Sequence, residues 1–118
     1  MLIDFNQVKH AYLICGYTDL RKGIDGLAAL VAHEYHLDLF DGTVFLFCGR
    51  RTDRFKALYF DGEGFILLYK HYDRGNLRWP RTENEAKLLS KKQRQWLFDG
   101  LSITQNIKVH PAKIGVLT

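Results

Sequence analysis

The chain has 118 residues, of which 47% are hydrophobic and 14% are aromatic. This length and composition predict one globular domain with a substantial core and exclude wholesale disorder. The 17 lysines and arginines outnumber the 13 acidic residues, which gives a net charge of +4. No apolar run approaches the ~20 residues of a membrane-spanning helix, so we expect no membrane association and no signal peptide. The two cysteines, Cys15 and Cys48, lie in apolar surroundings, which favours buried thiols in the reducing cytoplasm.

The first half of the chain predicts a strand followed by a helix. Residues 8–15 form the expected strand, and Gly16 and Tyr17 turn the chain. Thr18 is expected to cap a helix that runs to about His36, with Asp19 in its first turn. The apolar face of this helix repeats every three or four residues and consists of Leu20, Ile24, Leu27, Val31 and Tyr35. Gly23 and Gly26 weaken such a helix, and close packing against a sheet is the expected compensation.

The middle of the chain predicts a meander of three strands at residues 43–48, 55–60 and 65–72. The first is a continuous apolar run, which is typical of a strand buried on both faces. Asp61-Gly62-Glu63-Gly64 predicts a hairpin between the other two. We expect a turn at 73–76, a short edge strand at 77–79 that ends at Pro80, and a linker over 81–89.

The last predicted element is a helix within residues 88–103. Ser90 and Gln93 match the S-x-x-Q capping box. The helix would have an apolar face of Trp96, Leu97 and Leu101, Gly100 as its C-cap, and a mobile tail over 104–118. The predicted fold is a single α+β domain over residues 1–118. Its sheet and first helix lie within residues 8–80, and the elements follow in the order β-α-β-β-β. The sheet has four or five antiparallel strands, and one or two helices pack on one of its faces.

The positive charge is concentrated in residues 50–94, which hold twelve basic and six acidic residues, a net charge of +6. Such a concentration is typical of proteins that bind polyanions. A basic surface that is simply solvated explains the count equally well.

Two groups of residues carry this prediction. The loop 49–54 holds three arginines, and a guanidinium can bind a phosphate through two hydrogen bonds. The nearby strands supply Lys56, Lys70 and Arg78, interleaved with Tyr59, Tyr69 and Trp79 on which bases could stack. The aromatic rings could instead belong to the core, and Asp53 could pair with Arg50 or Arg54 and merely order the loop.

The second group is Lys91, Lys92 and Arg94, in the first turns of the last predicted helix. The helix dipole disfavours cations there by roughly 0.3–1 kcal/mol each, and a bound phosphate would reverse that sign. These side chains could equally extend into water.

Little in the sequence points to catalysis, a metal or a cofactor. His33 and His36 could share one helix face, but no further ligand at suitable spacing completes a metal site. The carboxylates Asp61 and Glu63 fit a hairpin turn better than a Mg²⁺ site. We therefore expect no cofactor and no catalytic set.

Several motifs in order resemble one known family. The matching stretches are Thr18-Asp-Leu-Arg-Lys-Gly-Ile-Asp-Gly-Leu27, Gly49-Arg-Arg-Thr-Asp-Arg-Phe-Lys-Ala-Leu58, Asp61-Gly62, Gly64-Phe65, Tyr69-Lys70, Gly75-x-Leu77-x-Trp79-Pro80 and Trp96-Leu-Phe-Asp-Gly-Leu101. They resemble the TnpB accessory proteins, the Orf-two-like family of bacterial insertion sequence 66 elements, which are distinct from the RNA-guided nuclease of that name. The resemblance spans residues 8–103, although Phe60 stands where the family usually has a tryptophan.

The resemblance implies a role in transposition beside a separate transposase that holds the catalytic carboxylates. The partners that it implies are the transposase and other proteins of the same element. DNA is the partner that the basic residues suggest, and the oligomeric state is left open.

Three functions remain open. In the first, a non-catalytic accessory factor binds DNA phosphates through Arg50, Arg51, Arg54 and Lys56, assisted by Arg21 and Lys22, with Lys91, Lys92 and Arg94 as a second patch. In the second, Trp79, Trp96 and the arginine loop anchor an adaptor on the transposase. The third is a metal-dependent nuclease that uses Asp19, Asp25 or Asp61.

Overall fold

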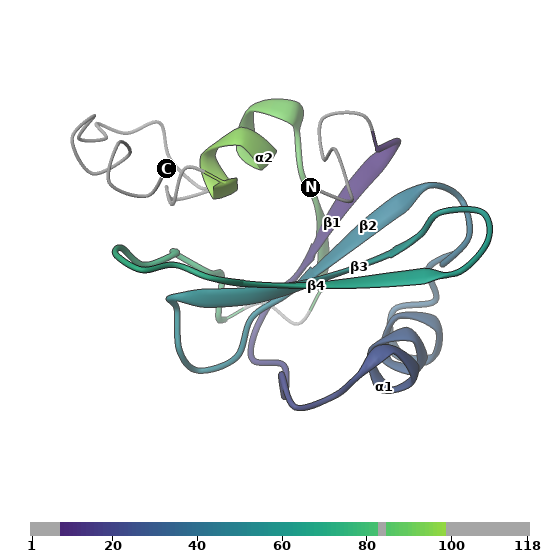
Figure 1. Cartoon of the computed structure of the whole chain (residues 1–118), viewed down its shortest axis with the longest axis horizontal. Helices are drawn as coiled ribbons and strands as arrows, with labels where there is room; N and C mark the ends of the chain where they lie inside the picture. Colours follow the sequence, from purple (N-terminus) through teal and green to yellow (C-terminus); the bar gives the residue numbers. More distant parts are fainter. Residues whose placement is uncertain (1–7, 83–84, 99–118) are drawn as a thin grey trace.

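The computed structural model describes residues 8–82 and 85–98, with side chains up to residue 95. The elements in chain order are β1 (His10–Ile14), α1 (Ile24–Ala29), the π-helical turn η1 (Leu30–Glu34), β2 (Thr43–Phe47), β3 (Arg54–Phe60), β4 (Phe65–His71), β5 (Ala86–Leu88) and α2 (Lys91–Phe98). The five strands form one sheet in the order β4-β3-β2-β1-β5 (Figure 1). The predicted α+β class is confirmed.

The sheet is mixed, because β1 and β2 are parallel, with Ala11 opposite Val44 and Tyr12 opposite Phe45. The other three strand pairs are antiparallel. The prediction of a wholly antiparallel sheet is therefore wrong for this one pair. The segment that contains α1 carries the chain back along the sheet, so both strands start at the same edge, as parallel pairing requires.

Both faces of the sheet are covered. On one face, Phe45, Phe47 and Leu58 pack with Leu27 and Val31 of the helical segment. On the other face, the core is built from strands β1, β2 and β3 and from the segments that follow β4 and β5. Its buried residues include Ala11, Leu13, Val44, Leu46, Phe55, Ala57, Tyr72, Leu77, Trp79 and Leu89. All five residues of β2 are buried, as predicted. Helices α1 and α2 lie on opposite sides of the sheet rather than on one face (Figure 1).

Ile24, Leu27 and Val31 of the predicted apolar face lie on the helical segment, but the helix begins at Ile24 instead of after Thr18. The other two predicted residues, Leu20 and Tyr35, pack against the same cluster from just outside the helical segment. The N–H of Thr18 donates to the carbonyl of Cys48 at 2.9 Å, which ties this residue to the end of β2. Gly23 is the N-cap, and a Cβ on Gly26 would meet the Lys22 side chain, so the expected packing of these glycines against the sheet is wrong. The helical segment ends near the predicted position.

Residues 77–79 do not form the predicted edge strand. The N–H of Leu77 donates to Thr52, the indole of Trp79 donates to the carbonyl of Ile14 at 2.8 Å, and Pro80 accepts from Gly16. These bonds reach different segments, so the connection crosses the sheet instead of pairing along one strand. The predicted linker over 81–89 contains β5, which pairs with β1. Three residues beside charged neighbours are too short a run to show strand periodicity.

Two local predictions are confirmed. The N–H of Asp61 donates to the carbonyl of Gly64 in the hairpin between β3 and β4. Ser90 and Gln93 exchange side-chain to backbone hydrogen bonds of 2.9 and 3.1 Å, which is the capping box of α2. The side chains of Trp96 and Leu97, together with residues 100–118, lie outside the described part.

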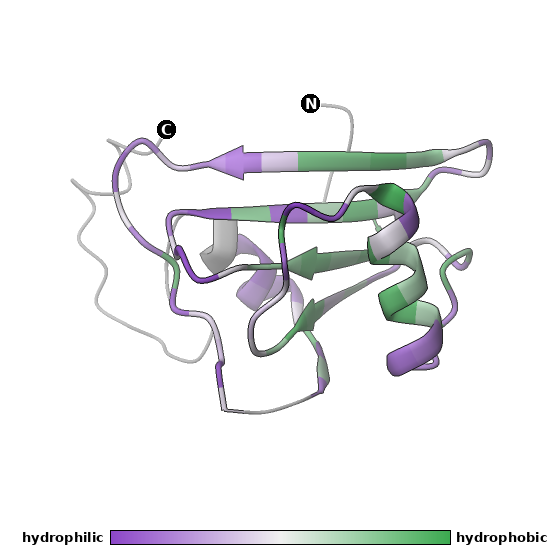
Figure 2. Cartoon of the chain, turned by 90° about the horizontal axis from the view of Figure 1, so that it is seen from below, coloured by the Kyte–Doolittle hydropathy of each residue, from purple (hydrophilic) through white to green (hydrophobic). Residues whose placement is uncertain are grey.

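Figure 2 views the molecule from the side of α1 and shows hydrophobic residues along most of the sheet, with hydrophilic residues in the connecting loops. Across the described residues, no helix combines the length and the apolar character that a bilayer crossing requires.

Candidate functional site: a basic groove

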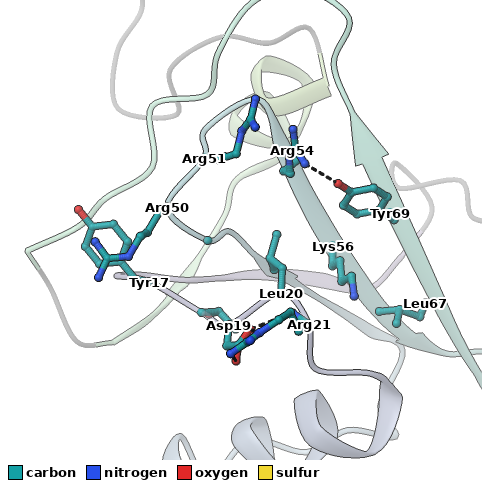
Figure 3. Close-up of a pocket in the computed structure, with 12 residues that line it drawn as sticks. Tyr17, Asp19, Leu20, Arg21, Arg50, Arg51, Arg54, Lys56, Leu67 and Tyr69 are labelled. Carbon is teal, nitrogen blue, oxygen red and sulfur yellow. Dashed lines mark hydrogen bonds and ion pairs between the residues drawn. The ribbon is translucent and has the colours of Figure 1, made fainter.

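An open groove of about 920 Å³ lies where the parallel strands β1 and β2 end (Figure 3). It is lined by the segment after β1, by the β2–β3 loop and by residues of β3 and β4. Because β1 and β2 are parallel, the segments that leave them meet at one edge of the sheet, where ligands of parallel sheets commonly bind. The charged lining residues, which we call the basic groove, are Arg21, Arg50, Arg51, Arg54 and Lys56, with Asp19 as the lining acid.

The pleat of β3 determines which of its side chains reach the groove. Phe55 and Ala57 pack into one core cluster, so Arg54 and Lys56 extend from the opposite face, the face that α1 covers further along. Helix α1 starts only at Ile24, so it leaves this end of the face uncovered. The late start of the helix is thus the reason that the groove exists.

One carboxylate organises the arginine loop. Arg54 donates to Asp53 from Nε at 2.9 Å, and Arg51 donates to the other carboxylate oxygen at 3.2 Å. The ring of His71 lies 3.3 Å from the same oxygen. The hydrogen bond from Arg54, reinforced by the charge of Arg51, holds the pKa of Asp53 well below its ordinary range. The pairing of Asp53 with Arg54, which the sequence left open as an alternative, is present in the structure. One carboxylate that faces two guanidiniums leaves the loop positively charged.

The buried thiol of Cys48 also contacts the backbone of the arginine loop. The Sγ of Cys48 is 3.4 Å from the carbonyl oxygens of both Arg51 and Arg54. Burial raises the pKa of the Cys48 thiol, so it remains a protonated donor. Cys15 and Cys48 are both free and buried.

Asp19 and Arg21 form a second ion pair at the groove. Two guanidinium nitrogens of Arg21 donate to the two carboxylate oxygens, each at 3.0 Å, and the backbone N–H of Arg21 adds a third bond. These hydrogen bonds lower the pKa of Asp19 from 3.8 to about 2. The Asp19 carboxylate therefore closes a turn instead of starting a helix.

Two cations of the groove, Arg50 and Lys56, are not neutralised by an ion pair with any described residue. Arg50 is also exposed. The Nζ of Lys56 donates to the carbonyl of Lys22 at 3.2 Å, which holds it over the groove. Lys22 itself contributes this carbonyl and is not part of the lining.

Two tyrosines flank the groove (Figure 3). Tyr17 is 61% exposed, and the guanidinium carbons of Arg50 and Arg81 lie 5.6 and 4.2 Å from its ring centroid. Tyr69 is 52% exposed; it lies opposite Lys56 in the sheet and accepts a hydrogen bond from Arg54 at 3.2 Å. Sequence reasoning assigned Tyr17 to a turn and did not single out Arg81, since only the fold brings residue 81 beside residue 17.

The structure does not bring the other predicted site residues to the groove. Lys70 lies on the opposite face, with its Nζ 5.4 Å from the Tyr72 ring centroid, and Arg78 is exposed on the connection that crosses the sheet. Lys91 and Lys92 are exposed at the start of α2, on the other side of the sheet. The predicted residues therefore do not form a single basic face.

Trp79 and Arg94 are core residues, each with 5% exposure. The indole of Trp79 lies in the cluster that contains Phe55. The guanidinium of Arg94 donates to the carbonyls of Val8 and Lys9 at 3.1 and 3.4 Å, which ties α2 to the segment before β1. Burial lowers the pKa of Arg94. Neither side chain is placed to receive a base, a phosphate or a partner.

Two of the three carboxylates considered for a nuclease, Asp19 and Asp61, are engaged elsewhere. Asp19 is paired with Arg21, and the Asp61 carboxylate accepts two backbone N–H bonds inside the hairpin. Within residues 8–82 and 85–98, no three side chains of the metal-ligating types come together.

Comparison with known proteins agrees with the resemblance seen in the sequence. The family model described as "IS66 Orf2 like protein" matches residues 9–108. "Uncharacterized protein y4hO" of Sinorhizobium fredii (strain NBRC 101917 / NGR234) is 31% identical over 115 residues, which cover 97% of this chain and 100% of that protein. "Uncharacterized protein y4jC" of the same strain is 35% identical over 95 residues, 80% of each chain. No solved structure gives a significant match. The chain belongs to the IS66 Orf2-like family of accessory proteins associated with insertion sequences.

Proposed function

We propose that this protein is a non-catalytic accessory factor of insertion-sequence transposition that binds DNA through the basic groove. The observation that carries the proposal is the composition of the groove, which has five basic side chains and one acid in its lining. Family membership supports the cellular context, a bacterial cytoplasm that contains the transposase and other proteins of the same element.

The electrostatics of the groove suit a phosphate backbone. Arg50 and Lys56 both line the groove, and neither faces a described carboxylate. Arg51 gives Asp53 one hydrogen bond and keeps the rest of its exposed guanidinium for a phosphate. Arg54 also donates to Tyr69 and lies against His71, so it has fewer N–H groups left. Binding of this kind releases counterions from the nucleic acid and weakens steeply as salt rises.

A fluorescence anisotropy titration tests the proposal, with an element-end oligonucleotide and a random one, each single-stranded and as a duplex. We expect binding at low salt that weakens as the salt concentration rises. For each tenfold rise in salt, log K should fall by about 0.9 per phosphate neutralised on the duplex and by about 0.7 on the single strand. Replacing Arg50, Arg51 and Arg54 together by alanine should weaken binding to every sequence. Absence of binding to all four probes at low salt would overturn the proposal.

The groove would also accept an acidic segment of a partner protein. Trp79 is buried and offers no anchor for such a partner, so among the side chains that the structure describes the adaptor role rests on the basic groove. Capture of the transposase from a nuclease-treated lysate, together with no DNA binding, would favour the adaptor role.

A further inference from the structure

We propose that the basic groove takes single-stranded rather than duplex DNA, with bases stacked on Tyr17 and Tyr69 and phosphates held between them. This inference rests on the proposed function and names the form of the ligand. It follows from the position of the two tyrosines, the cations around each ring and the shape of the surface.

The two rings lie at opposite ends of the groove, on either side of its arginines (Figure 3). They are among the four large hydrophobic side chains that are exposed in the described part of the chain, at 61% for Tyr17 and 52% for Tyr69. The other two, Phe40 and Leu88, do not line the groove. A half-exposed ring forgoes the stabilisation of burial but offers a flat surface to a base.

Each ring has cations beside it. The Nζ of Lys56 lies 5.9 Å from the Tyr69 ring centroid, and Arg54 donates to the phenol oxygen of Tyr69. The guanidinium carbons of Arg81 and Arg50 lie over the Tyr17 ring, 4.2 and 5.6 Å from its centroid, so a base that binds there replaces a guanidinium on the ring or stacks on the guanidinium plane. A base stacked on either ring thus brings its own phosphate within reach of a cation. Alternating aromatic and basic groups along a groove are the arrangement that single-strand binders use.

A duplex cannot use these rings, because its bases are paired and stacked on one another. Proteins that read a duplex usually insert a helix or a strand pair into its grooves. The lining of this groove comes from the segment 17–21, the β2–β3 loop and side chains of β3 and β4, and neither described helix contributes to it. The groove is a depression bounded by side chains, so it fits a flexible strand better than a rigid double helix.

The test compares three fluorescein-labelled probes: oligothymidylate, the duplex of the same length and an abasic sugar-phosphate strand. The length is about 12 nucleotides, which is within the usual range of single-strand site sizes. We expect oligothymidylate to bind more tightly than both. Tyr69→Ala should weaken its binding by roughly fivefold to a hundredfold, the range for loss of one stacked base. Tyr69→Phe keeps the ring and should retain most of the affinity.

Phe40→Ala is the matched control, since Phe40 is 60% exposed and lies outside the groove. It should bind oligothymidylate as the natural protein does. Thermal unfolding of each variant checks that the fold is intact. Tyr17→Ala is the second variant and should also reduce binding to oligothymidylate without reducing binding to the abasic strand.

The outcomes separate this inference from the proposed function. Tighter binding to the duplex, or equal binding to the abasic strand, overturns the stacking inference and leaves DNA binding in place. A fourth probe, oligouridylate of the same length, tests the assignment to DNA, and tighter binding to it than to oligothymidylate overturns that assignment. Absence of binding to every probe at low salt overturns both.

Discussion

The guanidinium of Arg54 donates a hydrogen bond from Nε to Oδ1 of Asp53 at 2.9 Å, at the point where the arginine loop enters β3. Arg51 donates to the other oxygen of the same carboxylate. The loop is therefore both ordered and partly neutralised by a single acidic side chain. This relationship sets how many positive groups remain for a ligand.

Asp53→Asn should strengthen DNA binding at low salt. The substitution removes one negative charge beside Arg51 and Arg54 and frees their N–H groups for phosphates. The salt dependence of log K should steepen by about 0.9 for each additional phosphate contact. Anisotropy titrations at several salt concentrations measure both quantities. Weaker binding with an unchanged slope would mean that Asp53 serves mainly to orient the arginines.

Asp19→Asn should make the free energy of unfolding less sensitive to acid. The pKa of Asp19 is about 2 in the folded protein and 3.8 ordinarily, so the unfolded chain binds more protons between these values. The stability that Asp19 contributes is present above about pH 4 and is lost as the pH falls through about 2. Urea unfolding at pH 6 and at pH 3 measures the difference. If the variant and the natural protein lose equal stability between these pH values, the ion pair with Arg21 does not form in solution.

Trp79→Ala should destabilise the fold by about 3–5 kcal/mol, the usual cost of removing a large buried ring. The ring packs with Phe55 and the indole N–H is bound to the carbonyl of Ile14, so the variant loses both. Urea unfolding provides the measurement. Arg78→Ala is the neighbouring control, because Arg78 is exposed and should change stability by less than about 0.5 kcal/mol. An unchanged stability in Trp79→Ala would contradict the core position of this ring.

Arg94→Ala should also lower the free energy of unfolding, by about 1.5–3 kcal/mol for the charge-assisted hydrogen bonds lost to the carbonyls of Val8 and Lys9. Lys91→Ala removes an exposed charge from the same helix and should be nearly neutral. At temperatures where both variants are folded, their DNA affinities should match. A selective loss of affinity in folded Arg94→Ala would place Arg94 in the DNA-binding surface.

Local signals in the sequence were sufficient to predict much of the fold. The apolar run of β2, the hairpin at 61–64 and the capping box of α2 each depend on neighbouring residues, and all three are confirmed. The start of α1 could not be predicted in this way. Thr18 and Asp19 are good helix-capping residues, but the Thr18 N–H is bound to Cys48, and Asp19 closes a turn with Arg21.

The site was predictable only in part, for the same reason. The arginine loop and Lys56 are close in sequence, and they line the same groove. The approach of Tyr17 and Arg21 to that loop depends on the parallel pairing of β1 and β2, which strand patterns alone do not reveal. The inward position of Arg94 depends on its two long-range carbonyl partners, and charge counting placed it on the surface instead.

The most direct test compares two double variants with the same net charge. Arg50→Ala with Lys56→Ala removes two cations from the basic groove, and Lys91→Ala with Lys92→Ala removes two exposed cations from the other side of the sheet. Anisotropy titrations with labelled element-end DNA, single-stranded and duplex, should show a large loss of affinity and a shallower salt dependence for the first pair only. Equal losses in the two double variants would contradict binding in the groove and indicate that net charge alone attracts DNA.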